Sequence, residues 1–174
     1  MSLDILFSEA EIAARVEAMG YEIAEALPAR LLAVPVMTGA FIFAADLLRA
    51  LYRAGVEPEV DFFQVASYGN ETTSSGRVEM LREVRADVTG RDVLLIDDIL
   101  ESGRTLSYAR NILMERGARR VLIAVALEKP QKRVVEIAAD FVGFLCADRF
   151  VIGYGMDYAG KYRELPFIGA LDEG

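Results

Sequence analysis

The chain of 174 residues contains no histidine and no tryptophan, and it has a single cysteine. The absence of histidine excludes imidazole bases, the usual zinc ligands and a Ser-His-Asp triad. Any catalysis must therefore use carboxylates, lysine, arginine, hydroxyls or backbone groups. Cys146 has no intrachain partner for a disulfide, which is typical of a reducing compartment, and a buried apolar role suits it best. We expect a cytoplasmic protein.

Basic charge and long apolar runs are also scarce. Lys and Arg number 19 against 27 Asp and Glu, which gives a formal net charge of −8. Such a chain is repelled by nucleic acid and by anionic membranes, so we expect neither as a partner. The N-terminus lacks the basic flank and apolar core of a secretory signal. The longest uncharged stretch, LLAVPVMTGAFIFAA, contains Pro35 and Gly39 and is shorter than the ~20 residues of a membrane-spanning helix.

Apolar segments alternate with amphipathic ones along most of the chain. Ser8 and Glu11 have the spacing of a capping box ahead of a helix over 9–27. Further helices are predicted over 40–55 and 104–118, and strands over 30–37, 60–68, 91–98, 119–129 and 139–146, with a short strand over 77–84. Apolar strands that alternate with helices predict an α/β fold, with a central parallel sheet of about five strands and helices on both faces. We expect one domain, with a core over about 30–145 and a small hood lobe from about 1–29 and 146–174.

The segment VLLIDDILESGRTL, residues 93–106, ends a buried strand with two adjacent acids, Asp97 and Asp98. A glycine and hydroxyl side chains then precede a predicted helix, and free amides at a helix start bind anions such as phosphate. Carboxylates repel phosphate, so these two acids suit sugar hydroxyls or a metal ion. The pattern predicts a site for a phosphorylated ribose. The structural alternative is that the acids only cap the turn.

This segment resembles the phosphoribosyl pyrophosphate signature of the type I phosphoribosyltransferases. Four further segments are similar, in the same order, to the hypoxanthine-guanine branch of that family: VPVMTGAFIFAADL, SYGNETTSSG, ALEKP and DFVGFLCADRFVIGYGMDYAGKYRELPFIGAL. The resemblance covers roughly residues 30–171. It implies a magnesium-dependent enzyme of purine salvage, which transfers phosphoribose from phosphoribosyl pyrophosphate to hypoxanthine or guanine and yields IMP or GMP.

The resemblance also implies roles for the phosphoribosyl site. Asp97 and Asp98 are expected to hold the ribose hydroxyls, directly or through Mg²⁺. The residues expected around the 5′-phosphate are Glu101, Ser102, Gly103, Arg104 and Thr105. Those expected at the pyrophosphate are Met37, Thr38, Gly39 and Arg163, with a strained peptide between Val36 and Met37.

For the base, the resemblance implies that Lys129 donates to the 6-oxo group, which distinguishes oxopurines from adenine. Phe141 is expected to stack on the ring, and the Val142 backbone to read its opposite edge. Glu101 is expected to accept the proton from the purine, and Asp148 to bind a second Mg²⁺.

Ser67 and Tyr68 are expected to lie on a lid loop that closes over the reacting centre and excludes water. Two positions depart from the family. Glu101 replaces the usual aspartate and is one methylene longer, and Met37 stands where many relatives have lysine.

Two alternatives stay open from the sequence. One is a relative that prefers xanthine, and the other is a regulator of the same fold that senses a nucleotide and contacts nucleic acid. The acidic composition argues against the regulator. The resemblance also implies a homodimer or homotetramer.

Overall fold

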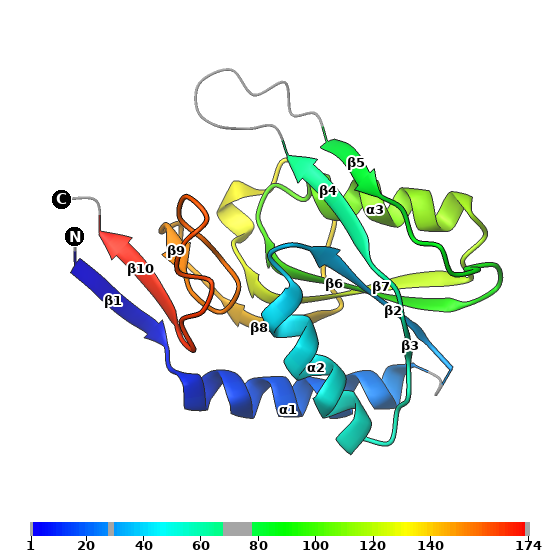
Figure 1. The fold of residues 1–174 in the computed structure, drawn as a ribbon, viewed down its shortest axis with the longest axis horizontal. Coiled ribbons are helices and arrows are strands. Elements are labelled where there is room, and N and C mark those ends of the chain that lie inside the picture. Colours follow the sequence, from blue (N-terminus) through cyan, green and yellow to red (C-terminus); the bar gives the residue numbers. More distant parts are fainter. Residues whose placement is uncertain (1, 28–29, 68–77, 173–174) are drawn as a thin grey trace.

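The computed structural model describes residues 2–27, 30–67 and 78–172, in which a seven-stranded sheet is covered by helices (Figure 1). Its strands are β2 (Leu32–Met37), β3 (Glu59–Val60), β4 (Phe63–Ser67), β5 (Val78–Arg82), β6 (Asp92–Leu100), β7 (Arg120–Glu128) and β8 (Phe141–Leu145). The order is β5-β4-β2-β6-β7-β8, and β3 also pairs with β2. All neighbours pair in parallel except β5, which runs antiparallel to β4. The expected α/β fold with five main parallel strands is confirmed.

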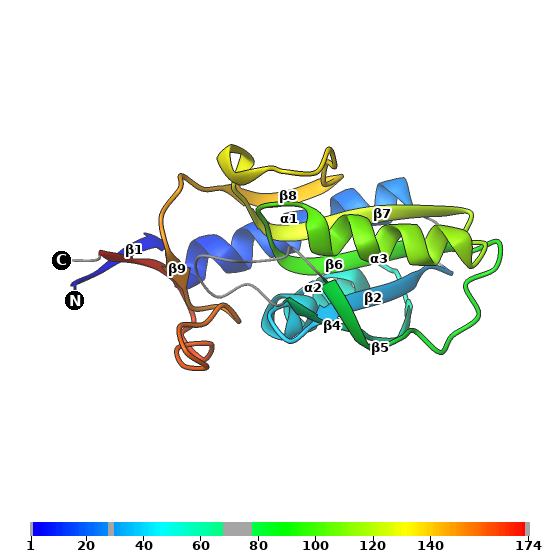
Figure 2. The ribbon, with the colours of Figure 1, turned by 90° about the horizontal axis from the view of Figure 1, so that it is seen from above.

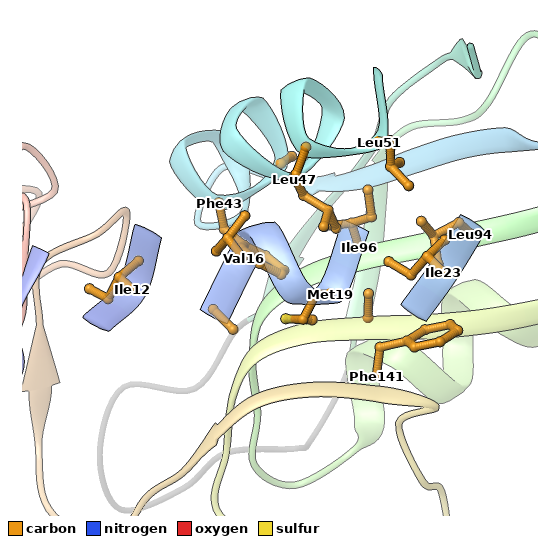
Figure 3. Close-up of a cluster of buried hydrophobic side chains, with 14 of the residues drawn as sticks. Ile12, Val16, Met19, Ile23, Phe43, Leu47, Leu51, Leu94, Ile96 and Phe141 are labelled. Carbon is orange, nitrogen blue, oxygen red and sulfur yellow. The ribbon is translucent and has the colours of Figure 1, made fainter. Parts of the chain in front are cut away.

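Helices cover both faces of this sheet (Figure 2). Successive side chains of a strand point to opposite faces, and the central strand β6 shows this directly. Leu94 and Ile96 pack with α1 (Glu9–Ala26) and α2 (Phe41–Arg53), in the cluster drawn in Figure 3. Val93 and Leu95 pack on the other side, with α3 (Arg104–Glu115). Within the described residues, no helix is both long and apolar enough to cross a membrane.

A smaller antiparallel sheet stands beside the main one and joins the two ends of the chain (Figure 1). It contains β1 (Ser2–Phe7), β9 (Val151–Ile152) and β10 (Ile168–Asp172), with β10 in the middle. These strands come from the two segments for which a hood was expected, and we call this sheet with its loops the hood. Helix α1 starts with the predicted capping box of Ser8 and Glu11, but it packs on the main sheet, so only β1 of the N-terminal segment joins the hood.

Candidate active site

A cavity of about 470 Å³ opens at the carboxyl ends of β2 and β6, where parallel sheets usually bind ligands. Its wall combines the turn after β2, the turn after β6 and one loop of the hood. The lining residues used below are Met37, Thr38, Gly39, Asp97, Asp98, Glu101, Ser102, Gly103, Thr105, Asp157 and Arg163. The structure thus brings together most of the residues expected at the ribose and its phosphates.

The turn between β6 and α3 has the geometry of an anion seat. Gly103 is the N-cap of α3 at φ 84°, a left-handed conformation that favours glycine. The Arg104 amide donates to Ser102 Oγ at 3.3 Å, and Thr105 faces the cavity. The Arg104 side chain is exposed and does not line the cavity, so only its backbone belongs to the seat. Amides and hydroxyls at this helix start can hold a phosphate.

The two acids at the end of β6 are close to each other and to the turn after β2. Asp97 Oδ1 accepts from the Asp98 amide at 2.9 Å, and Asp98 Oδ1 accepts from the Ile99 amide at 2.8 Å. Burial raises the pKa of both carboxyls, and repulsion from Asp98 raises the pKa of Asp97 further. A Cβ at Gly39 would lie 2.1 Å from Asp98 Oδ2, so only glycine lets this carboxylate approach the turn.

The turn after β2 meets the hood loop at Gly155, where an added Cβ would lie 2.3 Å from the Gly39 carbonyl oxygen. Arg163 Nη1 donates to the Gly155 carbonyl at 2.5 Å, and Arg163 Nη2 pairs with Asp157 Oδ1 at 2.9 Å. Arg163 therefore brings a cation to the same cavity as the phosphate seat. The unusual peptide of this turn is a cis bond between Met37 and Thr38, one residue later than the bond expected to be strained.

A second cavity of about 560 Å³ adjoins the first and shares Asp98, Ile99, Glu101 and Asp157 with it. Lys129 lines it and is buried, with 3% exposure of the residue. Its Nζ lies 2.7 Å from Glu101 Oε1, so the expected base-reading cation and the expected proton acceptor form an ion pair. The Phe150 ring is also part of this wall and is 47% exposed.

Three residues expected at the base or the metal do not line either cavity. The Phe141 ring packs in the core beside Met19 and Ile23 of α1 (Figure 3). The Val142 carbonyl accepts from Arg15 Nη2 at 2.8 Å, so α1 already uses this group. These two placements are wrong, because β8 carries both residues into the sheet and away from its carboxyl edge.

Asp148 is likewise misplaced as a metal ligand. Its carboxylate pairs with Lys132 at 3.0 Å on the surface and lines neither cavity. Asp157 lines both cavities, as Asp98 and Glu101 do, and the sequence interpretation missed Asp157 as it missed Phe150. Of the two lid residues, Ser67 ends β4 and Tyr68 lies outside the described residues.

The carboxylates fit a magnesium ion that also binds a phosphorylated ligand. Asp98 and Asp157 face both cavities, and burial raises the pKa of Asp97 and Asp98, so a cation bound beside them would favour the ionised form of both carboxyls. Among the described residues, no group of three or more acids, histidines or cysteines is arranged to hold a metal by itself. Mg²⁺ commonly takes one or two carboxylates together with substrate phosphates, and Asp98 and Asp157 are the carboxylates that would serve in this way.

Comparison with known proteins identifies the family to which this chain belongs. The model of the phosphoribosyl transferase domain matches residues 3–159. The chain belongs to the phosphoribosyl transferase family. Within that family it lies in the hypoxanthine-guanine branch, as the relatives below indicate.

Two curated relatives and one solved structure illustrate the match. The chain is 46% identical over 168 residues to the bifunctional protein TilS/HprT of Listeria monocytogenes, with coverage of 96% of this chain and 26% of that protein. It therefore spans about a quarter of that longer relative. It is 45% identical over 168 residues to the hypoxanthine-guanine phosphoribosyltransferase of Bacillus subtilis, with coverage of 96% and 92%. The structure of the Trypanosoma cruzi hypoxanthine phosphoribosyl transferase aligns with a TM-score of 0.90 and 37% identity, over 97% of this chain and 91% of that one.

Proposed function

We propose that this protein transfers phosphoribose from phosphoribosyl pyrophosphate to hypoxanthine or guanine, and releases IMP or GMP with pyrophosphate. The observation that carries the proposal is the meeting of the two cavities at Asp98, Glu101 and Asp157. One cavity has the groups that bind a phosphorylated sugar, and the other has a buried ammonium beside an exposed ring. A bond between sugar and base would form where the two cavities meet.

The first cavity is suited to phosphoribosyl pyrophosphate. The amides and hydroxyls of Ser102, Gly103 and Thr105 would hold the 5′-phosphate, with Glu101 as the first residue of the turn. The turn formed by Met37, Thr38 and Gly39 would bind the pyrophosphate through backbone groups, and Arg163 would supply the positive charge that Met37 lacks.

The second cavity is suited to an oxopurine. Lys129 is a donor without acceptor capacity, so it favours the 6-oxo group of hypoxanthine or guanine over the amino group of adenine. Phe150 takes the stacking role expected of Phe141, since its ring is exposed beside Lys129. The neighbouring Val151 takes the place expected of Val142, because it also lines this cavity.

The reaction forms the bond between a purine nitrogen and C1 of the ribose as the bond from C1 to the pyrophosphate oxygen breaks. The leaving pyrophosphate keeps the electron pair of that bond, and Glu101 accepts the proton from the purine ring. Asp97 and Asp98 orient the ribose through its hydroxyls and face the positive charge that develops on the sugar. Ser67 and Tyr68 remain the proposed lid that excludes water.

Asp98 and Asp157 would hold the magnesium ion together with the substrate. The bound ion would neutralise the negative charge that develops on the departing pyrophosphate. We also propose a cytoplasmic enzyme that acts on small molecules and forms a homodimer or homotetramer.

The test is a spectrophotometric assay with phosphoribosyl pyrophosphate, with and without Mg²⁺, on hypoxanthine, guanine, xanthine and adenine. We expect turnover of hypoxanthine or guanine that requires Mg²⁺, and little reaction with adenine. Preferential use of xanthine would replace the proposal by the xanthine-specific alternative. No turnover of any oxopurine would refute it.

A further inference from the structure

Arg133 lies outside both cavities, but its guanidinium joins three parts of the wall behind them. It follows the short helix η1 (Pro130–Lys132), and its side chain is 19% exposed. Its Nε donates to the Glu101 carbonyl at 3.0 Å, and its Nη2 donates to Glu128 Oε1 at 2.8 Å. Its Nη1 donates to the Ile137 carbonyl. Two of the three acceptors are backbone carbonyls and the third is a carboxylate, and the planar guanidinium suits several acceptors at once better than an ammonium does.

Two of these acceptors belong to the two halves of the active site. Glu101 begins the phosphate turn, which we define as residues 101–105. Glu128 ends β7 directly before Lys129. One side chain therefore links the backbone of the phosphate turn to the strand end that carries the base-reading ammonium.

The segment 133–137 also supports the phosphate turn from behind. The amides of Val134 and Val135 donate to the Ser102 carbonyl at 2.9 and 3.0 Å. A Cβ at Gly103 would lie 2.6 Å from Ile137 Cγ2 and 3.2 Å from Arg133 Cδ, so the two segments are in direct contact. A shift of this segment would therefore be transmitted to the phosphate turn.

We propose that Arg133 is a positioning residue, which keeps Glu101 and the phosphate turn aligned with Lys129. This inference rests on the proposed function and adds a residue that touches neither substrate. The reaction needs the 5′-phosphate, the proton acceptor and the base-reading cation in one fixed arrangement, and small displacements of such groups lower rates strongly.

Arg116 provides a matched control at the far end of α3. Its guanidinium also donates to two backbone carbonyls, those of Val84 at 2.5 Å and Ala86 at 3.1 Å, and to Glu83 Oε1 at 3.3 Å. Its side chain is 29% exposed and lines neither cavity of the site. Arg116→Met therefore removes a similar set of hydrogen bonds without touching the phosphate turn.

The experiment compares Arg133→Met, Arg133→Lys and Arg116→Met with the wild-type chain. We expect Arg133→Met to lower kcat/KM for phosphoribosyl pyrophosphate by about tenfold or more, and Arg133→Lys to retain part of the lost activity. Arg116→Met should keep kcat/KM within about twofold of wild type, even if its melting temperature falls as far as that of Arg133→Met. Equal kinetic losses in Arg133→Met and Arg116→Met would overturn the inference.

Hydrogen–deuterium exchange gives a readout that does not depend on turnover. We expect faster exchange in peptides covering 101–106 for Arg133→Met, or for Arg133→Lys if the methionine variant does not fold, and not for Arg116→Met. Faster exchange spread evenly over the chain would show a merely structural role and overturn the inference. If the wild-type chain catalyses no transfer, the proposed function fails, while the exchange comparison still decides what Arg133 holds in place.

Discussion

Glu101→Asp shortens the side chain that pairs with the buried Lys129, and its cost in stability follows from the geometry. Glu101 Oε1 lies 2.7 Å from Lys129 Nζ. Loss of one methylene removes about 1.5 Å of reach and leaves a gap of about 4 Å, too long for a hydrogen bond. A hydrogen bond to a charged group contributes about 1.5–3 kcal/mol, but Glu101 is 38% exposed, so solvent screens it. We expect a loss of about 1 kcal/mol, seen in calorimetry as a melting temperature lower by about 2–4 °C.

The same substitution should improve binding of the base. In the wild-type chain an incoming oxopurine must compete with Glu101 for the Lys129 ammonium. In Glu101→Asp the ammonium is available to the 6-oxo group, while the carboxylate that accepts the proton is kept. We expect KM for hypoxanthine to fall by about threefold or more and kcat/KM to rise. Steady-state kinetics at saturating phosphoribosyl pyrophosphate measures both.

Glu22→Asp is the control, because Glu22 pairs with Arg15 at 2.6 Å and is 46% exposed, outside both cavities. It should lower the melting temperature slightly and leave KM unchanged. The reasoning is refuted if Glu101→Asp leaves stability and KM as in the wild type. A total loss of activity would also refute it, since the pocket would then be shaped for glutamate.

Three further predictions concern the acids and the aromatic rings. The raised pKa of Asp97 means that folding favours its protonated form, and this contribution to stability is lost as the pH rises above about 4. Asp97→Asn should therefore raise the melting temperature near pH 7 without Mg²⁺ and give no gain near pH 3. It should also abolish most activity. An equal change in melting temperature at both pH values would contradict the raised pKa of Asp97. Phe150→Ala should raise KM for the purine by about tenfold with little loss of stability, whereas Phe141→Ala should cost about 3 kcal/mol or more in chemical denaturation. The reverse pattern would restore Phe141 to the base site. In Mg²⁺ titrations of activity, Asp157→Asn should need more metal for half-maximal rate and Asp148→Asn should match the wild type; the opposite result would return Asp148 to the metal.

The sequence predicts the framework well because local patterns decide it. The apolar strands and their helices alternate as expected, and the capping box of Ser8 and Glu11 starts α1. The residues predicted for the phosphate turn also lie together, since a glycine at the start of a helix and adjacent hydroxyls are a local pattern in the sequence. Residue 101 and its neighbours are close in sequence and close in space.

The base site is harder to predict, because the pair Phe-Val occurs twice within eleven residues. Phe141 and Val142 belong to β8, and Phe150 and Val151 follow that strand beyond its carboxyl end. Composition does not distinguish the two pairs, and only the direction of β8 in the sheet does. The general position of ligands beyond the carboxyl ends of parallel strands was the signal that would have favoured Phe150.

Composition likewise does not distinguish Asp148 from Asp157 as the metal ligand. Asp148 pairs with Lys132 on the surface, whereas Asp157 faces the cavities through a loop of the hood that is held by Arg163. The position of this loop depends on contacts with Gly39, which is more than a hundred residues away in the chain. Such contacts between distant segments leave no local pattern in the sequence.

The pairing of β1 with β10 has a consequence for how the molecule folds. Ser2 stands opposite Asp172, so the first strand of the described residues pairs with the last one. β10 is the middle strand of its sheet, and both β1 and β9 depend on it. Because contacts between residues far apart in the chain form late, the main sheet should assemble first. The loop that carries Asp157 and Arg163 would then be fixed in a later step, so the active site would be completed only after β10 has paired with β1 and β9.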